Sequence, residues 1–249
     1  MNTSTYVHIL NGDSLNQQFP IDLSGERIIC RECLCDGPVN AQFPNDFYKQ
    51  RTEFITSLDD EIQISDYYEK TVLEFEKLNS ISSNAEICFW FEDDLFCQVN
   101  FWFSTWLIHN QQKGNTFTLV RPNSLSPYGF GAYSQNELKT LFENRVQIKD
   151  LMQFVSLWNL YKSNNLKDLL SQGQNLSSEF SFIQEAINAH LDRFPSDKNE
   201  LPRPEKVLLE IASELHTKQF GSIFKEFCKR EPIYGFGDLQ VKKIYDKLL

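Results

Sequence analysis

Three short segments of this sequence gather polar side chains of the kinds that bind ligands and exchange protons. They hold Asn11, Gly12, Asp13 and Ser14, then Arg31, Glu32 and Asp36, and then Glu92, Asp93, Asp94 and Gln98. Grouped carboxylates can hold a divalent metal such as Mg²⁺, act as general acid and base, or bind a cationic ligand. Arginines beside them can hold an anionic part of the same ligand. These residue types therefore predict a site for a polar small molecule.

We expect two kinds of role within this site. The expected catalytic residues, as acid/base groups or metal ligands, are Asp13, Glu92 and Asp94. The expected ligand-binding residues are His8, Asn11, Gly12, Ser14, Arg31, Glu32 and Gln98. No glycine-rich phosphate loop, G-x-S-x-G or H-E-x-x-H motif accompanies them. The ligand, the metal and the reaction are therefore left open, and a metal-assisted hydrolase or transferase is the leading hypothesis.

The same carboxylates also have a structural interpretation. Asp13 or Ser14 could cap the helix that follows by accepting a bond from a backbone N–H. The acids at 92–94 suit the start of a helix, because carboxylates interact favourably with the positive end of the helix dipole. Three acids in a row exceed that need, so both interpretations stay open.

The basic candidates have structural alternatives as well. Arg31 and Glu32 could form an ion pair with each other, and Arg121 could anchor the loop that begins at Pro122. His8 lies within an apolar strand, where a buried histidine with satisfied hydrogen bonds is more common than a catalytic base.

Alternating apolar runs and helical patterns predict how these segments come together. Strands are expected at 6–10, 27–33, 86–91 and 116–120, with helices at 45–58, 65–78 and 95–108 between them. This alternation predicts an α/β fold with a mostly parallel, Rossmann-like sheet of about four strands flanked by helices. Ligands bind beyond the carboxyl ends of such strands, where the polar segments lie. We therefore expect Asp13, Arg31, Glu32 and Asp94 in one pocket.

The segment 95–108 is the most apolar part of the chain. Apolar side chains occupy almost the whole circumference of the expected helix, which predicts that it is buried against the sheet. It is shorter than the roughly 20 residues that a bilayer span requires and includes Gln98 and Asn100. No membrane association is expected.

From residue 134 onward the pattern is helical, and no further strand is expected. A capping box of Ser134 and Glu137 opens the first helix. Helices are expected at 135–144, 148–163, 178–193, 204–217, 222–230 and 238–249, with a loop in the Asn-, Gln- and Ser-rich stretch 164–178. The expected organisation is an α/β domain with the ligand site at 1–133, a helical extension packed on it at 134–195, and a small helical C-terminal domain at 196–249.

The formal net charge of −10 disfavours nucleic acid and anionic membranes as partners, because the long-range field repels phosphate. The residues from 201 onward are the exception, with nine Lys and Arg against seven Asp and Glu. Their last three helices could form a helix-turn-helix-like module that presents Lys242, Lys243 and Lys247 to an acidic partner. A non-enzymatic regulatory or interaction protein is therefore the alternative hypothesis. A solvated helix face is the simpler interpretation of the same lysines.

Cysteine usage bears on the cellular compartment and on metal binding. The N-terminus shows no basic region followed by an apolar run, so a cytoplasmic location and reduced thiols are expected. Cys30, Cys33 and Cys35 could begin a zinc site, but no second close pair of Cys or His completes it. The six cysteines are interpreted as core thiols.

The three polar segments also resemble a known family. His8-Ile-Leu-Asn-Gly-Asp-Ser14, Arg31-Glu-Cys-Leu-Cys-Asp-Gly-Pro38 and Trp90-Phe-Glu-Asp-Asp-Leu-Phe-Cys-Gln98 look like the successive signatures of the bacterial Domain of Unknown Function 1835 family. The segment 204–249, with Gly235-Phe-Gly-Asp-Leu-Gln240, is similar to the helical domain often joined to it. The residues that this resemblance singles out are His8, Asn11, Gly12, Asp13, Arg31, Glu32, Gly37, Pro38, Glu92, Asp94 and Gln98.

The family carries no established activity, so the resemblance implies the domain layout and these residues but no mechanism. Cys35 and Cys97 stand where family members have other, often polar, residues, which weakens a role for cysteine chemistry.

Overall fold

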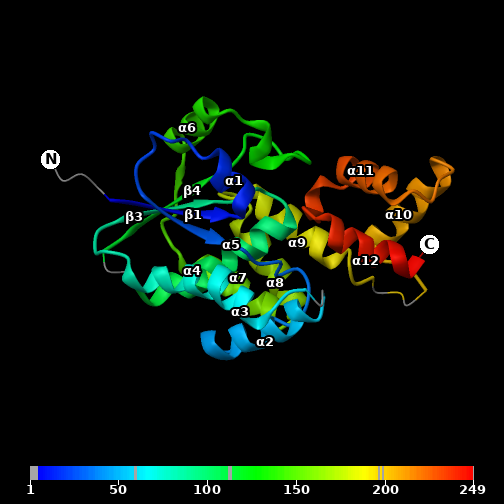
Figure 1. Ribbon diagram of the computed structural model, residues 1–249, viewed down its shortest axis with the longest axis horizontal. Coiled ribbons are helices and arrows are strands. Elements are labelled where there is room, and N and C mark those ends of the chain that lie inside the picture. The colour runs from blue at the N-terminus through cyan, green and yellow to red at the C-terminus, as the bar shows by residue number, and fades with distance from the viewer. Residues whose placement is uncertain (1–4, 59–60, 112–113, 196, 198, 249) are drawn as a thin grey trace.

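A computed structural model describes residues 5–58, 61–111, 114–195, 197 and 199–248 (Figure 1). Its centre is a five-stranded sheet in the order β2-β1-β3-β4-β5. The strands are β1 (Tyr6–Asn11), β2 (Glu26–Cys30), β3 (Glu86–Trp90), β4 (Thr116–Val120) and β5 (Val146–Gln147). The first four are parallel, and β5 runs antiparallel to β4. The prediction of a mostly parallel α/β sheet flanked by helices is confirmed.

The strand β5 corrects the expectation that no strand follows residue 133. Val146 pairs with Leu119, and Gln147 pairs with Thr118. Both β5 residues are exposed, and two residues are too few to show an alternating pattern in the sequence. The segment expected to be a purely helical extension therefore also supplies the edge of the sheet.

Helices cover both faces of the sheet because its central strands are apolar on both faces. On one face, Ile9 and Phe89 belong to the larger core cluster. On the other face, Leu10 and Trp90 pack with residues of α1 (Asp13–Gln18) and α6 (Gln135–Glu143). The two faces therefore alternate residue by residue along each strand.

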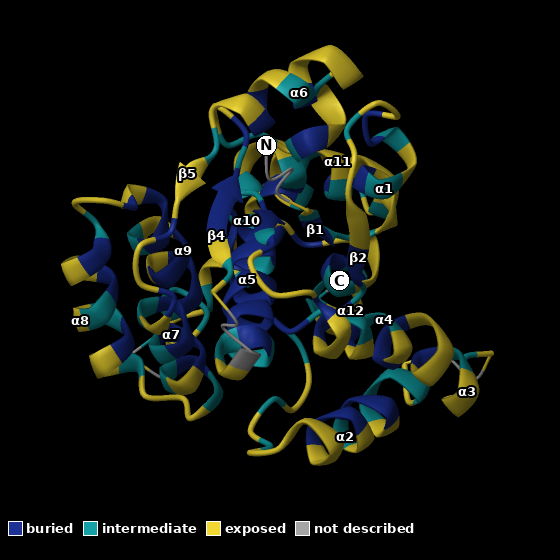
Figure 2. Cartoon of the chain, turned by 90° about the vertical axis from the view of Figure 1, so that its left-hand side faces the viewer, coloured by how far each residue is buried: buried dark blue, intermediate teal, exposed yellow. Residues whose placement is uncertain are grey.

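The prediction of a buried helix at 95–108 is confirmed by α5 (Leu95–Ile108). Trp102 and Phe103 are fully buried, and the rings of Phe101 and Phe89 lie 5.2 Å apart between centroids. Figure 2 shows α5 as a dark blue, buried element between the sheet and the outer helices. No helix among the described residues is both long and apolar enough to cross a bilayer.

The crossover from β2 to β3 is helical. Its elements are α2 (Pro44–Thr56), α3 (Ile64–Tyr67), the π-helical turn η1 (Tyr68–Val72), α4 (Leu73–Glu76) and the 3₁₀ turn η2 (Lys77–Ser80). The last four follow one another without a break and correspond to the helix expected at 65–78.

The remaining helices follow α5 in the chain. They are η3 (His109–Gln111), η4 (Gly129–Ala132), α6, α7 (Met152–Lys162), α8 (Leu166–Leu176), α9 (Ser181–Leu191), α10 (Arg203–Glu214), α11 (Phe220–Arg230), η5 (Pro232–Tyr234) and α12 (Asp238–Leu248). The capping box of Ser134 and Glu137 forms as predicted. Figure 1 shows α10, α11 and α12 beyond the carboxyl ends of the parallel strands.

The helix α8 corrects the interpretation of 164–178 as a loop. Asn165 caps this helix by accepting a hydrogen bond from the backbone N–H of Asp168. Leu169 and Leu176 lie seven residues apart, on one face, and both are buried. The Asn, Gln and Ser side chains that suggested a loop occupy the remaining faces of an amphipathic helix.

Candidate functional site

A pocket of about 290 Å³ lies at the carboxyl ends of β1 and β3. Its walls come from the ends of these two strands, from α1 and the start of α5, from the loop at 126–131, and from the last part of α11 with the turn that follows it. The strand order reverses between β1 and β3, because β2 lies outside β1 and β4 lies outside β3. Ligands of open α/β sheets bind at this kind of switch point.

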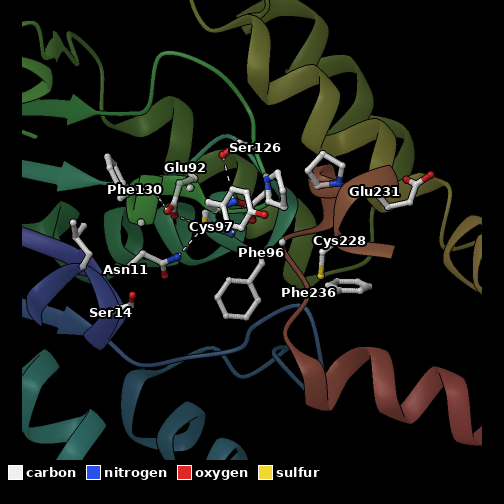
Figure 3. A pocket seen from close by; sticks show the side chains of 18 of the residues that line it. Asn11, Ser14, Glu92, Phe96, Cys97, Ser126, Phe130, Cys228, Glu231 and Phe236 are labelled. Atoms are coloured by element: carbon white, nitrogen blue, oxygen red, sulfur yellow. Dashed lines mark hydrogen bonds between the residues drawn. The ribbon is translucent and has the colours of Figure 1, made fainter. Parts of the chain in front are cut away.

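Glu92, Asp94 and Cys97 form the polar centre of the pocket. One side-chain ligand atom from each lies within 4.8 Å of the others. The Cys97 thiol donates to Glu92 Oε2 at 2.8 Å, and the backbone N–H of Phe130 donates to Glu92 Oε1 at 2.9 Å. Asp94 caps α5 by accepting a bond from the Cys97 N–H at 2.9 Å. Figure 3 shows the Asn11 amide pointing to the Cys97 thiol, with Glu92 beside it.

Burial and like charge change the acidity of two of these groups. The pKa of Asp94 is raised to about 7, first by burial and then by the neighbouring Glu92 carboxylate. The pKa of Cys97 is raised well above its usual value of 9.0 by burial and by both carboxylates. Cys97 is therefore a protonated hydrogen-bond donor, whereas Asp94 can gain or lose a proton near neutral pH.

Asn11 is held in place at the end of β1. Its Oδ1 accepts a bond from Asn100 Nδ2 at 3.0 Å, and its Nδ2 donates to Cys97 Sγ at 2.8 Å. Gln98, fully buried on α5, donates from Nε2 to the backbone carbonyl of Glu92 at 2.7 Å. Asn11 therefore lines the pocket, and Gln98 supports the backbone beneath it. Ser14 also lines the pocket, from α1.

Asp13 and Arg31 lie outside the lining of this pocket. Arg31 binds the Asp13 carboxylate through two hydrogen bonds of 2.8 Å, and its Nη1 donates to the Lys70 carbonyl at 2.5 Å. The hydrogen bond from Arg31 holds the pKa of Asp13 below its usual value. Gly12 has a φ of 89° and is the N-cap residue of α1. The expected common pocket of Asp13, Arg31, Glu32 and Asp94 therefore does not form.

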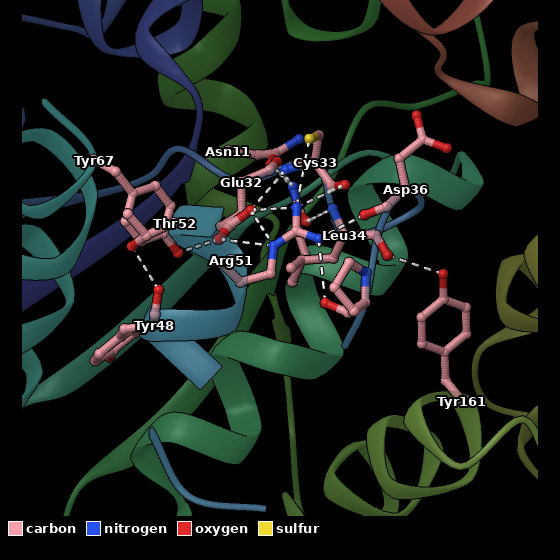
Figure 4. A network of polar contacts seen from close by, with 12 residues as sticks. Asn11, Glu32, Cys33, Leu34, Asp36, Tyr48, Arg51, Thr52, Tyr67 and Tyr161 are labelled. Atoms are coloured by element: carbon pink, nitrogen blue, oxygen red, sulfur yellow. Dashed lines mark hydrogen bonds and ion pairs between the residues drawn. The ribbon is translucent and has the colours of Figure 1, made fainter. Parts of the chain in front are cut away.

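Glu32 belongs to a separate buried network (Figure 4). Arg51 Nη2 donates to Glu32 Oε2 at 2.9 Å, and the Tyr67 hydroxyl donates to Glu32 Oε1. Arg51 Nη1 also donates to the Asp36 carbonyl at 2.6 Å. Both charged side chains are fully buried, so this ion pair ties α2 to the loop after β2. The partner of Glu32 is Arg51 and not the adjacent Arg31.

His8 projects to the opposite face of the sheet and does not line the pocket. Its Nε2 donates to the Ser24 carbonyl at 3.1 Å, and its Nδ1 accepts from Trp90 Nε1, also at 3.1 Å. Because a neutral imidazole has one donor and one acceptor, these partners define a neutral Nε2–H tautomer. Burial lowers the pKa of His8 to about 4, which keeps it neutral.

Arg121 is also held outside the pocket. Its Nε donates to Asp93 Oδ1 at 2.7 Å, and its guanidinium lies 4.2 Å from the centre of the Phe182 ring. Arg31 and Arg121, the two arginines considered as contacts for an anion, therefore both form ion pairs with carboxylates of the chain itself.

Several pocket residues were missed by the sequence interpretation. Gly129 and Phe130 come from the loop after β4, and Glu231, Gly235 and Phe236 come from the turn after α11. A Cβ at Gly129 would overlap Glu92 Oε1, and one at Gly235 would overlap Asp94 Oδ1. Both glycines have a positive φ, 48° and 62°. Their only signal in the sequence is the glycine itself, because tertiary packing brings them to the carboxylates.

The donor set of the pocket fits Mg²⁺ poorly. Mg²⁺ takes oxygen ligands in a near-octahedral arrangement, whereas one of the three grouped side chains, Cys97, offers sulfur. A thiolate suits a softer cation such as Zn²⁺ better. The raised pKa of Cys97 opposes the deprotonation that any such coordination would need.

Comparisons with models of protein families, with curated proteins and with solved structures find no match to this chain.

Proposed function

We propose that this protein binds a polar small molecule in the pocket between β1 and β3, and that Asp94, beside the Glu92 carboxylate, exchanges a proton with it. The observation that carries the proposal is the buried Asp94 carboxyl, whose pKa is raised to about 7 by burial and by Glu92. A group that titrates near neutral pH inside a pocket is suited to general acid/base catalysis. Many hydrolases and transferases use such a group.

The proposed roles follow from the contacts of each side chain. Asp94 donates or accepts the proton, and Glu92 holds the complementary charge. Cys97 and the Phe130 N–H stabilise the Glu92 carboxylate by donating to it. Asn11 presents a fixed amide at the pocket wall and orients the ligand.

Membership in the Domain of Unknown Function 1835 family stays a proposal. It is supported by the placement of Asn11, Glu92 and Asp94, which come from two of the three signatures and line one pocket. Gly235, from the C-terminal signature, lines the same pocket.

The interaction-protein hypothesis has less support from the contacts of its lysines. Lys242 pairs with Asp246, and Lys247 Nζ lies 2.8 Å from Glu205 Oε1. Lys243 Nζ lies 5.9 Å from the centre of the Phe54 ring. These cations have partners within the chain, so we prefer the pocket as the functional site.

A thermal-shift screen against polar metabolites tests the proposed function, because a ligand of the folded state raises its stability. Compounds that stabilise the wild type should lose affinity by about tenfold or more in Glu92→Gln and Asp94→Asn. Asp13→Asn is the matched control, since its carboxylate lies outside the pocket, and should respond like the wild type. Equal responses in all four proteins would contradict the proposal.

A further inference from the structure

The pocket has an excess of negative charge. Its lining includes the carboxylates of Glu92, Asp94 and Glu231, and none of its described lining residues is Lys, Arg or His. Glu231 has a partner outside the pocket, because Arg203 Nη2 lies 2.9 Å from its Oε2. No ion pair of the described residues involves Glu92 or Asp94, and the nearby Arg121 pairs with Asp93.

Among these carboxylates, an uncompensated negative charge costs the most free energy at Asp94. Its side chain is buried and only 7% accessible, yet it lines the pocket. Its Oδ1 accepts the Cys97 N–H at 2.9 Å, and no ion pair of the described residues involves its carboxylate. A buried carboxylate without a counter-ion must either take up a proton or attract a cation. The structure therefore leaves this carboxylate available to a positively charged ligand.

The apolar part of the lining is mostly aromatic. Beside Leu15, Pro127 and Pro232, it includes Phe96, Tyr128, Phe130, Phe227 and Phe236. Figure 3 shows Phe96 and Phe236 on the side of the pocket away from Phe130, so aromatic groups border the carboxylates from more than one direction. Aromatic faces attract organic cations and also accommodate their hydrocarbon parts. A hydrated metal ion would gain little from such walls.

We infer that the ligand of this pocket is an organic cation with a protonated amine head group. This inference rests on the proposed function and adds the chemical class of the ligand. The ammonium group donates to the Asp94 and Glu92 carboxylates, and its apolar part packs against the aromatic rings. A carboxylate or phosphate ligand is repelled by the same two acids.

The inference is tested by calorimetric titration of the full chain with three probes at about pH 8, where most Asp94 is ionised. Benzylamine, benzyl alcohol and benzoate share one ring and differ mainly in charge. We expect benzylamine to bind about tenfold more tightly than benzyl alcohol, and benzoate to bind most weakly. Asp94→Asn should remove the preference for the amine. Glu53→Gln, which removes an exposed carboxylate on α2, should keep it.

The outcomes separate this inference from the proposed function. If benzyl alcohol or benzoate binds as tightly as benzylamine and loses affinity in Asp94→Asn, the pocket is a ligand site but the cationic class is wrong. If no probe binds, or Asp94→Asn leaves benzylamine binding unchanged, the inference is overturned. A separate titration with ZnCl₂ tests for a metal site. The pocket would be a metal site instead if Zn²⁺ binds the wild type and displaces benzylamine, and if Asp94→Asn abolishes Zn²⁺ binding.

Discussion

Gly235, in the turn between α11 and α12, lies so close to Asp94 that a Cβ at this position would overlap Asp94 Oδ1. The glycine has a φ of 62°, in the left-handed region that other residues rarely adopt. The C-terminal helices thus supply one wall of the pocket, and this turn fixes the space around a carboxylate of the α/β sheet. The relationship makes the position of the C-terminal helices part of the site itself.

The first prediction concerns this contact. Gly235→Ala should destabilise the protein by about 1–3 kcal/mol, because it combines a strained φ with the overlap at Asp94. Gly221→Ala is the control, since Gly221 is in α11 and a Cβ there meets nothing within 4 Å. The control should be neutral or stabilising by about 1 kcal/mol. Urea unfolding measures both, and equal stabilities would show that the turn does not pack against Asp94.

The second prediction contrasts two arginines that carry the same substitution. Arg51→Met should cost about 3–5 kcal/mol, because it leaves the fully buried Glu32 without its counter-ion. Arg31→Met removes a partly exposed pair with Asp13 and should cost about 1 kcal/mol or less.

Chemical denaturation of both variants and of Glu32→Gln/Arg51→Met measures this difference. The double variant should recover part of the loss, because no uncompensated charge remains buried. A similar cost for Arg51→Met and Arg31→Met would contradict the assignment of the Glu32 network as a structural clamp.

The third prediction concerns His8. Burial lowers its pKa to about 4 from 6.5, so the folded protein favours the neutral ring. Its contribution to stability is present above about pH 6.5 and is lost as the pH falls towards about 4. Imidazole ¹⁵N spectra should show the Nε2–H tautomer at neutral pH and no titration near 6.5. A His8 that titrates at 6.5 would place it in solvent and contradict its bonds to Ser24 and Trp90.

The sequence predicted the features that are encoded over short distances. The strands, the buried helix α5 and the capping box at Ser134 each follow from a pattern within one segment. Proximity of Asn11, Glu92 and Asp94 followed from one rule, that the ends of parallel strands meet.

Features that depend on tertiary contacts were not predictable in this way. The partners of Asp13 and Glu32 could not be chosen correctly, because Arg31 and Arg51 are equally basic in sequence and differ only in where the fold places them. The role of Gly235 was missed for the same reason, since it reaches Asp94 through the packing of a distant turn.

The fourth prediction follows from the sign of the Asp94 shift. Its pKa is raised from 3.8 to about 7, so its contribution to stability is fully present below about pH 3.8 and is lost as the pH rises through 7. Each pKa unit corresponds to about 1.4 kcal/mol, so the full effect is on the order of a few kcal/mol. Asp94→Asn keeps the helix cap and removes the buried charge. The free energy of unfolding of this variant should therefore decline less than that of the wild type between about pH 5 and 8. Urea unfolding at both values checks this, and parallel declines would contradict it.

The central claim is that the buried Asp94, beside Glu92, exchanges a proton near neutral pH, and a carboxyl ¹³C NMR titration of Asp94 tests it most directly. We predict an apparent pKa of about 7 in the wild type and a lower value in Glu92→Gln, where the neighbouring charge is absent. Asp13 is the internal reference, because its bond to Arg31 places its pKa below 3.8. An Asp94 that titrates together with Asp13, and is unchanged in Glu92→Gln, would contradict the account.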